Sequence, residues 1–100
     1  MALPPFLKAL ESYDPKFAQV MEKMVSLSLA EGSLDPKTRT LIALALDAAL
    51  GASEGVTSLA QQARKIGVTD QEISEALRLA YFASGNSVLI SSFAAFKDKE

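Results

Sequence analysis

Asp47 is the residue of this sequence that is best placed for acid–base chemistry. It lies in the most apolar part of the chain, residues 41–50, and shares a helical face with Thr40, Ala43 and Leu44. A buried carboxylate without a partner resists ionisation, and the C-terminal end of a helix disfavours its charge further. Asp47 is therefore a candidate general acid or base. The alternative is a structural ion pair, or a hydrogen bond to Ser, Thr or backbone.

Glu54 and Arg39 are the charged candidates nearest to Asp47 in the sequence. Glu54 falls in the first turn of a predicted helix, where the helix end stabilises a carboxylate. It is either the second acid of a pocket shared with Asp47 or a routine charge at a helix start. Arg39 either anchors an anionic ligand through its planar guanidinium group or pairs with Asp35 or Glu31.

Tyr81 and Asn86 flank a predicted helix break at Gly85. Polar groups near a helix end can fix a ligand, so both are candidates for the mouth of a small-molecule pocket. The alternative for Tyr81, next to Phe82, is a place in a subunit interface with its hydroxyl satisfied.

The residue types that the chain lacks exclude several chemistries. It has neither cysteine nor histidine, which excludes a thiolate nucleophile and zinc–thiolate ligation and removes the commonest general base. We therefore expect no metal and no cofactor.

A net charge of −2 with scattered basic residues gives no electrostatic footprint for nucleic acid. The purest apolar run, residues 41–46, is far below the ~20 residues of a membrane span, so we expect a soluble, cytoplasmic protein without a secretory signal.

Proline, glycine and capping residues predict an all-α chain of six helices. The expected helices cover about residues 4–10, 15–31, 36–50, 54–66, 70–84 and 87–96. Asp-Pro pairs at 14–15 and 35–36, Ser53 and a capping box at 69–72 mark the starts. Gly32, Gly51, Gly67 and the Gly85-Asn86 pair mark the ends. We expect one domain over residues 1–100, with the helices packed around the third, which is apolar nearly all round.

Helical spacing also predicts which side chains are buried. The expected apolar stripes comprise Phe17, Val20, Met21, Met24 and Leu27 in the second helix, Val56, Leu59, Ala60, Ala63 and Ile66 in the fourth, Ile73, Ala76, Leu77 and Ala80 in the fifth, and Leu89, Ile90, Phe93 and Phe96 in the last. Leu79 and Phe82 fall on the charged side of the fifth helix. Another subunit or the last helix of the same chain must cover them, and the 49% hydrophobic content favours self-association.

The helix junction at residues 50–59, with its flanks at 34–39 and 63–69, resembles the carboxymuconolactone decarboxylase family, which includes the AhpD-like alkylhydroperoxidases. The shared features include the opening Asp35-Pro36-Lys37-Thr38-Arg39, Gly51 before the next helix, and the segments 63–67 and 72–76. The resemblance implies trimers or hexamers. It also implies a Cys-x-x-Cys-x-x-x-His relay with a Glu, whose four positions hold Ala52, Gly55, Leu59 and Thr40 here.

Because none of these four side chains attacks a peroxide or relays a proton, the first hypothesis is an oligomeric scaffold without thiol peroxidase activity, with a pocket for a small molecule. The second is a cofactor-free enzyme that uses Asp47 and Glu54 on a carboxylate-bearing or lactone-like substrate. The third is a purely structural or interaction module.

Overall fold

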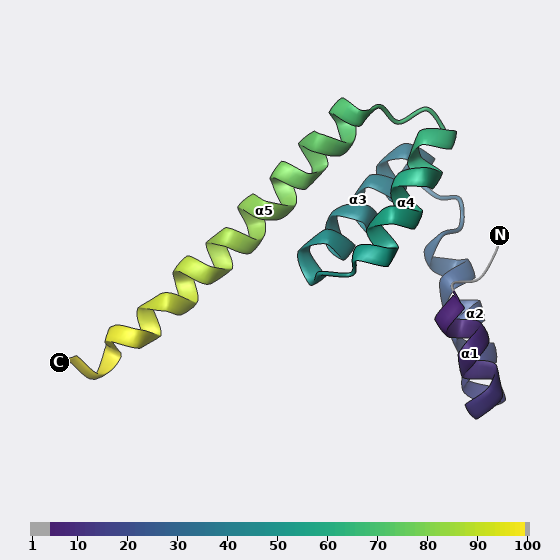
Figure 1. Cartoon of the computed structure of the whole chain (residues 1–100), viewed down its shortest axis with the longest axis horizontal. Coiled ribbons are helices and arrows are strands. Elements are labelled where there is room, and N and C mark those ends of the chain that lie inside the picture. The colour runs from purple at the N-terminus through teal and green to yellow at the C-terminus, as the bar shows by residue number, and fades with distance from the viewer. Residues whose placement is uncertain (1–4, 100) are drawn as a thin grey trace. The chain divides into compact units, whose positions relative to one another are not determined.

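The computed structural model describes residues 5–99, and its regular structure there is entirely helical (Figure 1). The elements are α1 (Pro5–Tyr13), α2 (Pro15–Ser28), α3 (Pro36–Leu50), α4 (Ser53–Lys65), α5 (Asp70–Ser92) and the 3-10 helix η1 (Phe93–Lys99). The all-α prediction is confirmed. The chain divides into two units, Met1–Ser33 and Leu34–Glu100, which are described separately. The single-domain organisation stays a prediction.

The first unit is a pair of packed helices, α1 and α2. The predicted start of α2 is confirmed, because the Phe17 N–H donates to the Asp14 carboxylate (3.1 Å) and Pro15 opens the first turn. The first helix runs to Tyr13, three residues beyond the expected end, and the predicted Pro4 lies outside the described residues.

The end of α2 and its buried stripe were predicted wrongly. The helix ends at Ser28 rather than Glu31, and Gly32 does not adopt the left-handed conformation expected of a stop. Two paired helices bury only Leu7 and Ala18. Most of the predicted stripe is exposed in this unit, namely Phe17, Val20, Met24 and Leu27. A helix pair offers too little apolar surface to cover a stripe of that width.

The second unit contains α3, α4 and α5, and most of their predicted boundaries are confirmed. Asp35 caps α3 by accepting from the Thr38 N–H (2.9 Å) and hydroxyl (3.0 Å). Gly51 and Gly67 both adopt positive φ, 76° and 92°, which side chains with a β-carbon rarely adopt. Ser53 is not the cap of α4. Ala52 holds the cap position without a side-chain hydrogen bond, and Ser53 is the first helical residue.

The core of this unit is small and lies where α3, α4 and the start of α5 meet. Its buried members are Leu44, Ala63, Val68 and Ile73. Partly buried apolar side chains pack against them, namely Leu41, Val56, Leu59, Ala60 and Leu77. The α4 stripe is thereby confirmed except for Ile66, which is exposed. The prediction of six helices around α3 is not confirmed, since α3 packs against α4 and α5 and only Leu44 on it is fully buried.

The expected break at Gly85-Asn86 is wrong. Helix α5 runs without interruption from Asp70 to Ser92, and Figure 1 shows its C-terminal half extending beyond α3 and α4. A glycine inside a helix costs only about 1 kcal/mol relative to alanine, which does not end a helix without a capping residue. The separate last helix from Ser87 is therefore absent, and Leu89, Ile90, Phe93 and Phe96 are exposed.

The helical segment Asp70–Asp98 is the one segment of the described chain that is long and apolar enough to cross a bilayer, by length and composition alone. The most apolar 18-residue window within it has no buried residue, whereas Ile73 near its start belongs to the core. A helix that packs against a protein partner can have the same length and composition.

The capping box at the start of α5 predicts a pH dependence of stability. The Thr69 N–H donates to Glu72 Oε1 (2.8 Å), the Glu72 N–H donates to Thr69 Oγ1 (3.1 Å), and the first of these bonds lowers the pKa of Glu72 below its ordinary 4.5. A lowered folded-state pKa adds stability above the unfolded-state value, and that stability is lost as the pH falls through the folded-state value. We expect Glu72→Gln to lose stability at about pH 7 and to show a shallower fall toward about pH 3 in urea unfolding. Glu75→Gln is the control, and parallel pH profiles for wild type and Glu72→Gln would contradict this account.

Candidate functional site

The junction between α3 and α4 brings Asp47 against Gly55. Asp47 lies in the last turn of α3 and is half-buried, while Gly55 lies in the first turn of α4. A β-carbon on Gly55 would lie 2.9 Å from Asp47 Cγ and closer still to Asp47 Oδ2. The Asp47 carboxylate therefore occupies the space into which a side chain at position 55 would project.

The backbone of the junction holds Asp47 in this place. The Gly51 N–H donates to the Ala48 carbonyl (3.2 Å) and the Ala52 N–H donates to the Asp47 carbonyl (2.9 Å), which closes the turn. The carboxylate then faces the first turn of α4, where the free N–H groups of a helix start favour negative charge.

Asp47 makes no side-chain hydrogen bond or ion pair with any other residue that the structure describes. The one ion pair in the described part of the chain joins Arg64 and Asp70 (2.9 Å). A structural ion pair, one alternative for Asp47, is thus not formed within residues 5–99.

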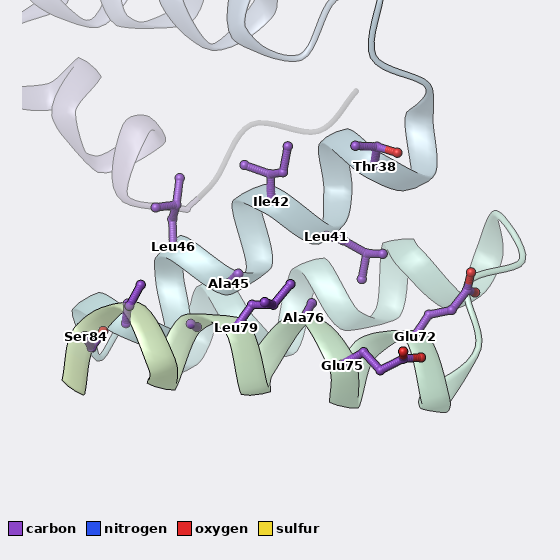
Figure 2. A pocket seen from close by; sticks show the side chains of 13 residues that line it. Thr38, Leu41, Ile42, Ala45, Leu46, Glu72, Glu75, Ala76, Leu79 and Ser84 are labelled. Carbon is purple, nitrogen blue, oxygen red and sulfur yellow. The ribbon is translucent and has the colours of Figure 1, made fainter. Parts of the chain in front are cut away.

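A groove lies between α3 and α5, on a part of the unit that does not include this junction (Figure 2). It has a volume of about 740 Å³ and is almost entirely apolar. Its lining residues are Thr38, Leu41, Ile42, Ala45, Leu46 and Ala49 on α3, and Glu72, Glu75, Ala76, Leu79, Ala80, Ala83 and Ser84 on α5. Neither Asp47 nor Glu54 lines it, so the structure does not bring these two carboxylates together in this groove.

The remaining candidates are dispersed. Arg39 Nη1 donates to the Leu34 carbonyl (2.8 Å), which ties the first turn of α3 to the segment before it rather than to Asp35 or Glu31. Tyr81, with 82% of its surface exposed, and Asn86 lie within the uninterrupted α5 and do not line the groove. Glu54 is exposed in the first turn of α4.

Sequence reasoning missed the groove and its two carboxylates. The capping box at 69–72 accounts for Glu72, and Glu75 has a place only in the family-like segment 72–76, so neither prediction involves α3. The signal that could have found them is their three-residue spacing, which places both on one side of α5 with Leu79 and Ala76.

The four positions of the relay hold side chains with structural roles. The Thr40 hydroxyl donates to the Pro36 carbonyl (2.8 Å) within its own helix. Ala52 is the cap residue of α4, and Leu59 packs against the core. Gly55 has no side chain, and the Asp47 carboxylate occupies the space beside it. The four relay positions therefore contain no thiol, imidazole or carboxylate.

Fold and site together define an all-α protein whose junction between α3 and α4 contains neither a thiol nor an imidazole. The family model described as the carboxymuconolactone decarboxylase family matches residues 15–98, and the chain belongs to this family. Searches of curated proteins and of solved structures gave no match.

Proposed function

We propose that this protein is an oligomeric scaffold of the carboxymuconolactone decarboxylase family, AhpD-like in type, that has lost thiol peroxidase chemistry. The observation that carries the proposal is the placement of the Asp47 carboxylate in the side-chain space of Gly55. The start of α4 is where a helix end would lower the pKa of a thiol and activate it. In this chain a carboxylate takes that place, and negative charge there disfavours a neighbouring thiolate.

Exposed apolar surface supports the oligomeric part of the proposal. Leu79 and Phe82 are 68% and 65% exposed, and no helix of the second unit covers them because α5 does not turn back. Contiguous apolar patches of this kind mark association sites in soluble proteins. The groove between α3 and α5 is the place proposed for an apolar small molecule, and we propose a cytoplasmic location. A monomer at micromolar concentration would contradict the oligomeric part.

A second candidate function is cofactor-free acid–base catalysis by Asp47, with Glu54 as the second acid. It is favoured by the half-buried Asp47 carboxylate, which has no side-chain partner among the described residues. A carboxylate-bearing or lactone-like compound would be the substrate. Turnover of such a compound that Asp47→Asn abolishes would support this candidate over the scaffold.

The scaffold proposal predicts that the purified protein does not reduce peroxides. With a dithiol as electron donor, we expect peroxide consumption equal to the background without protein, because no side chain can form a thiolate or a sulfenic acid. Consumption of hydrogen peroxide and of an organic hydroperoxide is followed over time. Heat-unfolded protein from the same preparation is the control for peroxide consumption caused by trace metal. Turnover above both backgrounds would overturn the proposal.

A further inference from the structure

From Leu79 onward, α5 and the 3-10 helix η1 that continues it carry an exposed stripe that is apolar except for one Asn and has coiled-coil spacing. Its members, called here the α5 stripe, are Leu79, Phe82, Asn86, Leu89, Phe93 and Phe96. They recur at alternating intervals of three and four residues, the pattern of positions that pack between helices. All six are exposed, and no charged residue occurs between Leu79 and Phe96.

The charges at the two ends of the stripe favour one orientation of a partner. Glu75 precedes the stripe by one turn, and Lys97 directly follows it. If two copies of the helical segment Asp70–Asp98 lay parallel and in register, Glu75 would face Glu75 and Lys97 would face Lys97. If they lay antiparallel, each Glu75 would face a Lys97, which is the complementary arrangement.

We propose that a second copy of this chain packs antiparallel along the α5 stripe, with Asn86 at the two-fold axis. This register places Leu79 opposite Phe93 and Phe82 opposite Ile90, so that apolar side chains face each other on both sides of the centre. It also places Glu75 opposite Lys97. The interface is isologous, since every contact occurs twice.

The centre of the stripe suits this crossing. Gly85 and Ser87 flank Asn86, and a β-carbon at Gly85 would meet nothing within 4 Å, so the surface there is low and open. Small side chains let two helices approach closely. A single polar Asn among apolar stripe positions fixes the register of a helix pair, because a shifted pair would place its amide against apolar side chains.

The α5 stripe borders the groove between α3 and α5, and Leu79 belongs to both. Leu79 lines the groove from α5, and Ile42 and Leu46 line it from α3 (Figure 2). The groove follows α5 from Glu72 to Ser84, about 18 Å at 1.5 Å per residue. In the proposed register, the partner's segment from Val88 onward lies opposite this part of α5. The inference rests on the proposed homo-oligomer and specifies how its two-fold contact is made.

Cysteine cross-linking tests the register, because the natural chain has no cysteine. The axes of two packed helices lie about 8–10 Å apart, and each Cα atom lies about 2.3 Å from its own axis. Cα atoms that face each other across the contact are therefore within the ~7 Å that a disulfide can bridge. We expect Asn86→Cys to form a covalent dimer under mild oxidation, seen on a non-reducing gel. Leu79→Cys and Phe93→Cys should each remain monomeric on the gel when oxidised separately. When the two variants are mixed, unfolded, refolded together and oxidised, they should cross-link to each other. Ser91→Cys, on the opposite side of α5, is the control and should not cross-link.

Sedimentation of the unmodified chain separates failure of this inference from failure of the proposed oligomer. An oligomer without the Asn86→Cys cross-link, or with Leu79→Cys linking to itself, would overturn the antiparallel pairing and leave the oligomer intact. A monomer would overturn both. A monomer that floats with vesicles of phosphatidylcholine and phosphatidylglycerol would also overturn both and would assign α5 to a membrane surface instead.

Discussion

Replacing Leu44 with alanine is expected to leave the second unit largely unfolded at room temperature. Leu44 has none of its surface exposed and lies at the centre of a core with only three other buried members, Ala63, Val68 and Ile73. Truncation of a buried leucine costs about 2–5 kcal/mol, because the lost transfer energy is joined by the energy of the cavity. Small domains lie at the low end of the 5–15 kcal/mol typical of folded proteins, so a loss of this size is a large share of the total.

The loss is measured by urea unfolding followed by circular dichroism. Leu50→Ala is the matched control, since Leu50 ends the same helix and is 82% exposed. We expect the control to lie within about 0.5 kcal/mol of wild type. Equal losses for the two variants would mean that Leu44 is not the centre of the core. A much larger loss for Leu50→Ala would place it in an interface.

Adding one methyl group at Gly55 is expected to destabilise the protein by about 1–3 kcal/mol, although alanine is normally the better helix former. The new β-carbon would collide with the carboxylate of Asp47, whose Cγ would be only 2.9 Å away. Shortening Asp47 to alanine should remove the collision, because the β-carbon of Asp47 lies at an ordinary 3.6 Å. In the Asp47→Ala background, Gly55→Ala should therefore be neutral or stabilising.

The coupling between the two positions is measured with a double-mutant cycle on the free energy of unfolding. Residues in direct contact show interaction energies of about 0.5–3 kcal/mol, whereas independent residues add. Ser74→Ala provides the control, because Ser74 is exposed in α5 and alanine there should stabilise the helix by about 0.5 kcal/mol in either background. Strict additivity at positions 47 and 55 would show that the carboxylate does not occupy the space of the missing side chain.

Signals that act within a few residues were predicted correctly from the sequence. The Asp14 and Asp35 caps, the Thr69–Glu72 capping box and the left-handed Gly51 and Gly67 each depend on bonds to the nearest turn. Their geometry is fixed by local chemistry, which the order of residues already contains. Ser53 is the exception, because the turn after Gly51 ended one residue earlier than a side-chain cap required.

Features that depend on distant surfaces were predicted poorly. The stop expected at Gly85 failed because no competing element was available to draw the chain out of its helix. The stripe of α2 was right in spacing, but burial also needs a partner surface, which the first unit does not supply. The groove was invisible in the sequence for the same reason, since its walls come from α3 and α5, more than twenty residues apart.

The contact between Asp47 and Gly55 also limits the order in which a thiol site could arise on this scaffold. Cysteine at position 55 collides with the carboxylate until Asp47 has been shortened. A route that begins at position 55 passes through a destabilised protein. A route that begins at position 47 does not. Reversal to a reactive junction is therefore expected to start one helix earlier than the residues that would carry the reaction.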